Sequence, residues 1–273
     1  MNVLVTLNST YIYPLKVMLK SLFLNNQEDY FDIYIMHSRL KKEEILDIEE
    51  FVQKHGSKVI EIKIEEEHFA NAPLILNYPK EMYYRLLAFR FLPNLDRILY
   101  LDPDILVINS VRELYQLDMD GYLYAAANRN SLSTTTVNKI RLKPYNIECY
   151  YNSGVLLMNL ELQRKYIIEQ EIYDFVKKYQ WKLVLPDQDI INALYAKLIK
   201  SLDEMVYNYD VRKYKSYKYS SKGACNMDYV INQTVFLHFC GKKKPWKSNY
   251  QGYFHALYKH YEKLTFHQTP IVS

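Results

Sequence analysis

Two carboxylates, Asp102 and Asp104, interrupt an apolar run in the stretch LYLDPDILV, residues 99–107. The apolar residues on either side are typical of a buried strand, where a charge is costly unless a partner neutralises it. Carboxylates two residues apart at a strand end can both reach one oxygen-preferring divalent cation whose other ligands are phosphates or waters. The alternative is a turn closed by Asx-type hydrogen bonds, and the pair alone does not decide between the two.

A parallel sheet is predicted to carry this pair. Strand-like runs alternate with helix-like stretches whose apolar residues recur every three or four positions, which is a βαβαβ pattern with right-handed crossovers. The predicted strands are 2–7, 32–37, 58–63 and 97–101, and the helices are 12–24 and 41–54. Ligands of such sheets bind outside the carboxyl ends of the strands, where residues 6–11 and 102–104 both fall.

The second half of the chain continues the alternation less regularly. The expected strands are 122–127, 150–160 and 234–239, and the expected helices are 110–117, 161–179, one after LPDQD at 185–189, and 250–263. After residue 203 the pattern weakens into a region rich in Tyr and Lys. Neither a linker nor an internal repeat suggests a second unit, so a single α/β domain is expected.

Charge, cysteine content and the start of the chain narrow the class of protein. Residues 211–273 hold 11 Lys and Arg but 2 Asp and Glu, a net charge of +9 in a chain whose total is +4. The chain begins with the strand-like MNVLVTL, and no apolar stretch reaches the roughly 20 residues of a membrane helix. Cys149, Cys225 and Cys240 have no metal-site spacing. A reduced, cytoplasmic protein is expected.

Polar residues mark the ends of several other predicted elements. Arg85 lies on a helix, Asn152 begins a strand with Ser153 and Gly154, Asp187 opens a helix, and His238 ends a strand. Each has an ordinary structural explanation, such as an ion pair, a turn, a helix cap or a buried histidine. Their occurrence together makes a ligand site the stronger interpretation.

Five stretches of the chain together resemble the motifs of the family-8 retaining glycosyltransferases, which include glycogenin and bacterial lipooligosaccharide galactosyltransferases. In chain order they are VTLNSTY, LYLDPDILV, NSGVLLMNL, LPDQD and LHFCGKKKPW, and the resemblance extends from the first strand to Trp246. It implies a single GT-A-type, Rossmann-like nucleotide-sugar-binding domain over residues 1–247, with a mostly parallel central sheet. Residues 248–273 would form a small basic, aromatic C-terminal extension.

The resemblance implies metal-dependent transfer of a hexose from UDP-glucose or UDP-galactose. Asp102 and Asp104 match the family's Asp-x-Asp, which binds Mn²⁺ or Mg²⁺ between the two phosphates of the UDP-sugar, and His238 matches the third protein ligand. Lys244 would add a cation on the same phosphates, and Gly241 would let the backbone approach them. A divalent cation stabilises the negative charge on the departing diphosphate.

The other donor contacts are implied in the same way. Thr6 and Asn8 are placed for uracil contacts and Tyr11 for stacking, although related enzymes often have Asp in place of Asn8. The residues expected to line the donor sugar are Arg85, Asn152, Asp187 and Gln188. Arg129 falls where related enzymes carry an acidic residue that touches the sugar, so the sugar's identity is left open.

Gln188 and Asp187 are the expected catalytic residues. Retention requires either a double displacement or a same-face substitution through an oxocarbenium-like state. The resemblance places Gln188 under the anomeric carbon, and an amide is a poor nucleophile. We therefore expect same-face substitution, with the leaving β-phosphate as base, Gln188 supporting the positive charge and Asp187 binding sugar hydroxyls.

Two other functions are compatible with paired aspartates. A metal-dependent nucleotidyltransferase would release pyrophosphate and make no use of LPDQD. A non-catalytic nucleotide-sugar-binding protein would release neither pyrophosphate nor UDP. Nucleic-acid binding is not expected, because no base-reading module accompanies the Lys and Tyr residues. The acceptor is left open among saccharides, lipid-linked saccharides, glycolipids and glycoproteins.

The basic, aromatic segments 212–219 and 242–263 resemble regions that rest on an anionic membrane. They suggest a cytoplasmic protein that lies peripherally on the inner face of the membrane. A solvated basic face is the alternative.

Overall fold

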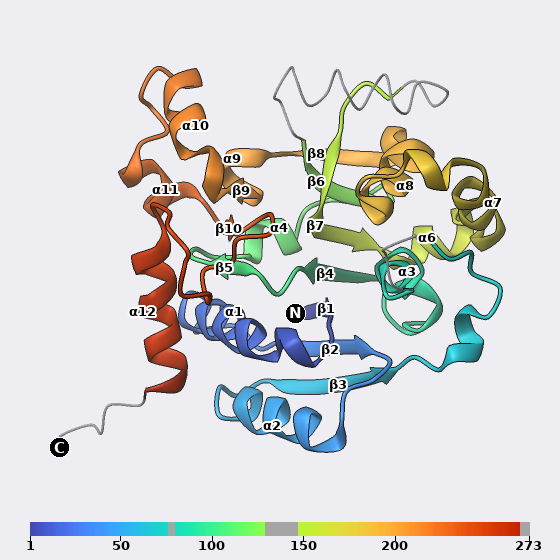
Figure 1. The fold of residues 1–273 in the computed structure, drawn as a ribbon, viewed down its shortest axis with the longest axis horizontal. Coiled ribbons are helices and arrows are strands. Elements are labelled where there is room, and N and C mark those ends of the chain that lie inside the picture. The colour runs from blue at the N-terminus through green and yellow to red at the C-terminus, as the bar shows by residue number, and fades with distance from the viewer. Residues whose placement is uncertain (76–79, 129–146, 268–273) are drawn as a thin grey trace.

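A seven-stranded sheet forms the centre of the computed structural model, which describes residues 1–75, 80–128 and 147–267 (Figure 1). The strand order is β3-β2-β1-β4-β7-β6-β8. β7 runs antiparallel to both of its neighbours, and the other pairings are parallel. The sheet's strands are β1 (Asn2–Thr6), β2 (Asp32–His37), β3 (Lys58–Lys63), β4 (Arg97–Leu101), β6 (Tyr124–Asn128), β7 (Tyr151–Asn159) and β8 (Ile199–Asp203).

Helices cover both faces of this sheet, because alternate residues of the strands point into two different apolar clusters. Leu99 and Leu101 of β4 pack with α1 and α2, whereas Ile98 and Tyr100 pack with α3, α6, α7 and α8. The bounds of these helices are α1 (Ile12–Leu24), α2 (Lys42–Gln53), α3 (Met82–Leu86), α6 (Leu160–Tyr166), α7 (Glu169–Tyr179) and α8 (Pro186–Tyr195), and α4 (Arg112–Tyr115) follows β5.

A small second sheet of order β5-β10-β9 lies beside the first. β10 pairs antiparallel with β5 and parallel with β9. The strands are β5 (Ile105–Val107), β9 (Tyr209–Asp210) and β10 (Phe236–His238), and the helices around them are α9 (Glu204–Tyr207), α10 (Tyr214–Ser220), α11 (Met227–Gln233) and α12 (His255–Phe266). Three residues, Asp102, Pro103 and Asp104, separate β4 from β5 of this second sheet.

The C-terminal helix α12 packs on the domain. It contacts α1, its Tyr258 and Tyr261 are buried, and Asn25 donates a hydrogen bond to the Tyr261 hydroxyl at 2.9 Å. Among the described residues, none of the helices is both long and apolar enough to cross a membrane.

The single α/β domain with a mostly parallel sheet is confirmed, but some expected boundaries differ. The helix expected at 161–179 is two helices, because Ile167 and Ile168 adopt extended backbone between α6 and α7. The final helix begins at His255 rather than at 250. The region after residue 203, where the pattern weakens, folds into the short elements β9, α9, α10 and α11.

Candidate active site

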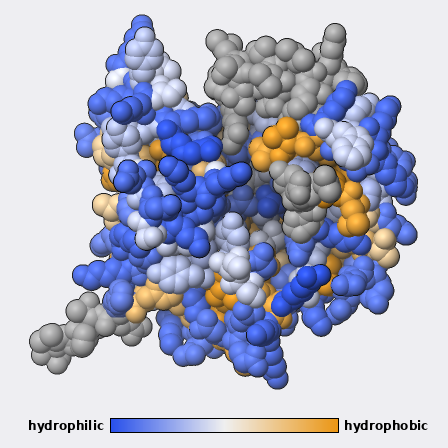
Figure 2. All heavy atoms as spheres, in the orientation of Figure 1, coloured by the Kyte–Doolittle hydropathy of each residue, from blue (hydrophilic) through white to orange (hydrophobic). Residues whose placement is uncertain are grey.

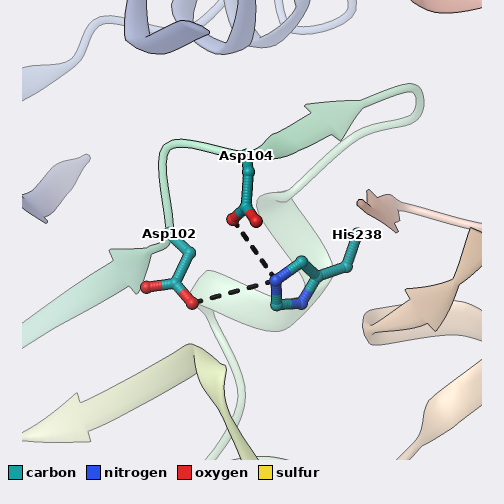
Figure 3. A group of neighbouring side chains, drawn as sticks. All are labelled: Asp102, Asp104 and His238. Carbon is teal, nitrogen blue, oxygen red and sulfur yellow. Dashed lines mark ion pairs between the residues drawn. The ribbon is translucent and has the colours of Figure 1, made fainter. Parts of the chain in front are cut away.

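Asp102, Asp104 and His238 come together where the two sheets meet (Figure 3). Asp102 follows β4, Asp104 precedes β5, and His238 ends β10. His238 Nε2 lies 3.3 Å from Oδ1 of Asp104 and 3.8 Å from Oδ2 of Asp102. One ligand atom of each residue lies within 4.8 Å of the others. The structure therefore assembles the three residues that the sequence motifs named as metal ligands.

Backbone pairing to two different sheets holds the aspartates in place. The amide of Asp102 donates to the carbonyl of Gly154 in β7 at 2.8 Å. The carbonyl of Asp104 accepts from the amide of Phe239 at 3.0 Å, and His238 pairs with Ile105 in the small sheet. Because each carboxylate is anchored to a separate sheet, their separation is set by the fold and not by a local turn alone.

The histidine is oriented from behind by an amide chain. His238 Nδ1 lies 2.8 Å from Oδ1 of Asn208, and Asn208 Nδ2 donates to Oδ1 of Asn152 at 2.7 Å. An amide oxygen accepts a hydrogen bond, so Nδ1 carries a proton and Nε2 faces the carboxylates. This is the arrangement in which imidazole ligates a metal, and Asn208 is a residue that the motifs did not name.

Gly154 leaves the space that this group needs. A Cβ at that position would lie 2.3 Å from Cε1 of His238 and 2.7 Å from Oδ2 of Asp102. Two carboxylate oxygens and an imidazole nitrogen are suitable ligands for Mn²⁺ or Mg²⁺, with coordination positions left for phosphate oxygens. The residues therefore fit a divalent cation.

The charges of this cluster compensate one another. Burial alone would raise the pKa of Asp104, but His238 and Lys244 hold that pKa well below its usual value. Burial lowers the pKa of His238, whereas Cys240 and Asp104 raise it, and the net value lies well above the ordinary one. Lys244 is ion-paired with Asp104 and donates to the Phe239 carbonyl at 3.0 Å. A proton and a divalent cation are alternative partners for the same oxygens and Nε2.

Arg85 joins the aspartates to helix α8. Its Nη2 lies 3.0 Å from Oδ1 of Asp102 and its Nη1 lies 3.1 Å from Oδ2 of Asp187. The guanidinium lies over the ring of Tyr100 at 4.4 Å, and the Tyr100 hydroxyl donates to Asp102 at 2.7 Å. Burial lowers the pKa of Arg85, but Asp102, Tyr100 and Asp187 raise it more, so the group is a permanent cation.

Asp187 and Gln188 open α8 with their side chains toward this network. Asp187 does not cap the helix: the N-cap residue is Leu185, which has no side-chain cap bond, and it is Oδ2 of Asp189 that accepts from the amides of Val184 and Leu185. Asp187 instead accepts from the Ser153 hydroxyl at 2.8 Å. Gln188 is buried, and its Nε2 has no hydrogen-bond partner among the described residues. An unpaired buried amide donor of this kind is suited to a ligand.

Thr6, Asn8 and Tyr11 lie on the other side of the aspartates. The Thr6 hydroxyl is 3.1 Å from the Tyr100 hydroxyl. Oδ1 of Asn8 accepts from the amide and hydroxyl of Thr10 as the cap of the 3₁₀ turn Ser9–Tyr11. The Nδ2 donor of Asn8 is thus free of the cap. Tyr11 is partly buried and meets Trp246 edge-on at 6.0 Å.

Two adjoining cavities, each of about 310 Å³, share Arg85, Asp102, Asp104 and Asp187. The first, here called the loop cavity, is also lined by Thr6, Leu7, Asn8, Tyr11, Glu81, Met82 and Pro103. The second, the helix cavity, is also lined by Asn152, Ser153, Gly154, Leu185, Gln188, Arg212, His238, Cys240 and Gly241. Apart from Lys244, which is paired with Asp104, all the expected site residues line one of them. Arg129 lies outside the described residues.

Tyr100, Asn208 and Arg212 belong to this site but carry no sequence signal of their own. Tyr100 is one apolar residue of a strand, and Asn208 and Arg212 lie in the region where the pattern weakens. Only their three-dimensional neighbours reveal them.

Comparison with known proteins places the chain among glycosyltransferases. The family model for glycosyl transferase family 8 matches residues 2–250. The lipopolysaccharide 1,2-glucosyltransferase of Escherichia coli is 28% identical over 264 residues, which cover 92% of this chain and 76% of that protein. General stress protein A of Bacillus subtilis strain 168 is 26% identical over 277 residues, which cover 97% and 94%.

The fold agrees with the sequence match. The solved structure of the galactosyltransferase LgtC, in complex with donor and acceptor sugar analogues, matches with a TM-score of 0.81 at 20% identity, covering 99% of this chain and 98% of that one. The expected GT-A-type fold is thus confirmed. With a family model that spans the sheet, both cavities and the Asp102–Asp104–His238 cluster, the chain belongs to glycosyltransferase family 8.

Proposed function

We propose that this enzyme transfers glucose or galactose from UDP to an acceptor, with retention of anomeric configuration and with Mn²⁺ or Mg²⁺ held by Asp102, Asp104 and His238. The observation that carries the proposal is the position of this cluster between the loop cavity and the helix cavity. The names of relatives, a lipopolysaccharide 1,2-glucosyltransferase and a lipopolysaccharide 1,3-galactosyltransferase, support a hexose and a cell-envelope polysaccharide or lipid-linked saccharide as acceptor.

The loop cavity suits the nucleoside. Tyr11 offers a ring face for uracil, and the free Nδ2 of Asn8 can donate to a uracil carbonyl while Oδ1 stays in the cap. The diphosphate then falls beside Asp102 and Asp104. The cation, when bound there, stabilises the negative charge on the leaving diphosphate, and Lys244 adds a second positive charge.

The helix cavity suits the hexose and the attacking hydroxyl. Arg85 holds Asp187 in place so that its carboxylate can accept from sugar hydroxyls. Gln188 has an unpaired Nε2, and its Oε1, which accepts from the Ser153 amide at 3.3 Å, is a poor nucleophile; this favours same-face substitution over double displacement. On this proposal the acceptor proton passes to the departing β-phosphate, and Gln188 stabilises positive charge at the anomeric carbon.

The test is turnover of purified protein with Mn²⁺ and a panel of UDP-sugars. We expect UDP release that depends on the cation and on an acceptor, with UDP-glucose or UDP-galactose as the best donor. Pyrophosphate release would instead indicate nucleotidyl transfer, and tight UDP-sugar binding with no product would indicate a binding protein. Product from a different nucleotide, such as a GDP-sugar, would contradict the donor assignment.

A peripheral contact with anionic membrane on the cytoplasmic side would bring the enzyme to a lipid-linked acceptor. The α10 side chains Lys215, Lys218 and Tyr219 are exposed, and Tyr219 is 88% exposed. Figure 2 shows that hydrophilic residues predominate over α10, α11 and α12 on this face. Cations beside exposed aromatic rings favour adsorption to anionic headgroups.

Liposome sedimentation tests this contact. Because α12 is packed on α1, point variants are better than truncation. The triple variant Lys215→Gln/Lys218→Gln/Tyr219→Ser should lose recovery with anionic vesicles, whereas neutral vesicles should recover little of either protein. Equal recovery of variant and parent protein with anionic vesicles would remove the idea.

A further inference from the structure

Arg212 is a cation on the wall of the helix cavity that the sequence motifs do not include. It lies in the 3₁₀ turn Val211–Lys213 and lines the cavity together with Gln188 and Gly241. It is not among the residues of the loop cavity. On the proposed function, Arg212 therefore lies on the side of the aspartates where the hexose and the acceptor meet.

A buried carboxylate fixes the direction of this guanidinium. Asp210 is 1% exposed and accepts from Nε of Arg212 at 2.8 Å and from Nη2 at 2.6 Å. The Arg212 side chain itself is 53% exposed. The negative end of the pair is thus buried, while the opposite edge of the guanidinium, which carries Nη1, points away from Asp210 and lies next to Gly241. A bidentate carboxylate pair holds a guanidinium plane in one orientation.

Gly241 keeps that edge open. Its φ is +88°, which glycine adopts without strain, and a Cβ there would lie 2.6 Å from Nη1 of Arg212. Lys242 and Lys243 follow directly, and both are exposed. Among the described residues neither forms an ion pair with a carboxylate. Arg212, Lys242 and Lys243 are called the basic rim below.

The basic rim adds positive charge that the donor does not require. Arg85 already pairs with Asp102 and Asp187, and Lys244 already pairs with Asp104. The diphosphate of the donor is expected at the aspartates, with the cation and Lys244. The hydroxyls of a neutral hexose gain little from three further cations, whereas a second anionic group gains charge-assisted hydrogen bonds.

We propose that the basic rim binds an anionic group, a phosphate or a carboxylate, carried by the acceptor saccharide, and that Arg212 is the contact that determines this specificity. The proposal rests on the proposed function and names the class of its acceptor. It predicts that neutral saccharides are poor acceptors and that the preference for anionic ones weakens as salt is added.

Binding to the protein saturated with UDP and Mn²⁺ tests this directly, because the donor phosphate site is then filled. Isothermal titration with glucose, glucose 6-phosphate, glucuronic acid and inorganic phosphate separates the contribution of the sugar from that of the charge. We expect at least one anionic sugar to bind about tenfold more tightly than glucose, as one or two charge-assisted hydrogen bonds would produce. Inorganic phosphate should bind more weakly than that sugar.

Two variants remove charges of the basic rim without leaving a buried carboxylate unpaired. Asp210→Asn/Arg212→Gln keeps a neutral hydrogen-bonded pair in place of the buried ion pair, and Lys242→Gln/Lys243→Gln changes only exposed residues. Both should lose most of the advantage of the anionic sugar while UDP affinity changes less than about twofold. Lys177→Gln/Lys178→Gln on α7, two exposed neighbouring lysines that line neither cavity, is the matched control and should bind like the parent protein.

The outcomes distinguish a failure of this proposal from a failure of the proposed function on which it rests. Failure of the parent protein to bind UDP with Mn²⁺ would contradict the proposed function. Normal UDP binding with equal affinity for glucose and both anionic sugars would overturn only the basic rim. The basic-rim proposal is also overturned if inorganic phosphate binds as tightly as the anionic sugars, or if the rim variants keep the preference for an anionic sugar over glucose.

Discussion

On the proposed function, two regions bind the same donor but are built in opposite ways: Asp102, Asp104 and His238, here called the metal cluster, and residues 6–11, here called the nucleoside loop. Asp104 and His238 are buried, anchored to the small sheet and in contact with each other, and Asp104 is also paired with Lys244. Asn8 is exposed, and its Oδ1 is bonded to Thr10 within the same turn. One region is fixed by residues far apart in the chain, and the other by a few neighbouring ones.

This difference determines how much free energy a substitution costs in each region. In the metal cluster the desolvation of the carboxylates is offset by Arg85, His238 and Lys244, so removal of one member leaves its partners buried and unpaired. In the nucleoside loop a substitution disturbs a solvated turn, and water replaces the lost contact at little cost. Changes in the cluster should therefore have large effects, and changes in the loop small ones.

Asp104→Asn should have the largest effect. The change keeps the shape of the side chain but removes one metal ligand and the partner of Lys244, so hexose turnover should fall by about two or more orders of magnitude. Thermal stability should fall by a few degrees, because the depressed pKa of Asp104 marks a carboxylate that stabilises the folded state. UDP release and thermal denaturation measure the two effects.

Asp174→Asn on the exposed face of α7 is the matched control and should change neither quantity. Full turnover by the Asp104 variant would mean that the cation is bound elsewhere. The contrast between the two regions would then fail at its stronger end.

Asn208→Ala should have the next effect. Loss of the amide oxygen frees the orientation of His238 without touching a ligand atom, and outer-shell changes of this kind typically cost about 10- to 100-fold in metal affinity. The measurement is the Mn²⁺ concentration that gives half-maximal UDP binding. Asn208→Asp restores the acceptor for His238 but loses the donor to Asn152, so it should recover part of the affinity, whereas a role that rests on the Asn152 bond alone would leave both variants equally weak.

The fold was predictable to a larger extent than the site. Strands such as 32–37 and 58–63 follow from local apolar pattern and lie where they were expected. Asp102, Asp104 and His238 were predictable because they belong to motifs. Asn208 gains its role from contact with His238, and Arg212 from its position beside Gly241, which no local pattern encodes.

The Asp210–Arg212 pair has a buried carboxylate, as the metal cluster has, but needs no metal. The pH dependence of folding stability therefore tests the cost of an unpaired buried carboxylate without a metal. Burial raises the pKa of Asp210, yet Arg212 lowers it further, and the net value is depressed. The stability from this pair is present above about pH 3.8, the unfolded value, and is lost as pH falls through the lower folded value.

Arg212→Gln reverses that sign. Burial then dominates, the folded pKa of Asp210 rises above the unfolded one, and the variant should gain stability as pH falls from 7 toward 4. Melting temperatures at pH 7 and at pH 4 should show a deficit of several degrees that narrows at the lower pH. A deficit that does not change with pH would mean that Asp210 is not the carboxylate left unpaired.

Asn8→Asp should have the smallest effect and tests the weaker end of the comparison. Aspartate keeps the cap on Thr10, because both side chains offer an acceptor oxygen there. It exchanges the Nδ2 donor for a second acceptor, which suits the N3–H of uracil in place of a carbonyl. UDP affinity in the presence of Mn²⁺ should therefore change by no more than a few-fold, with CMP and GDP still excluded.

Asn8→Ala, which loses the cap as well, should lower UDP affinity by a further few-fold. Asn2→Ala at the start of β1 serves as the control. If either Asn8 variant reduced UDP affinity as strongly as Asp104→Asn, the loop would contribute as much to donor binding as the cluster. The exposure of Asn8 would then not predict its contribution to the free energy of UDP binding.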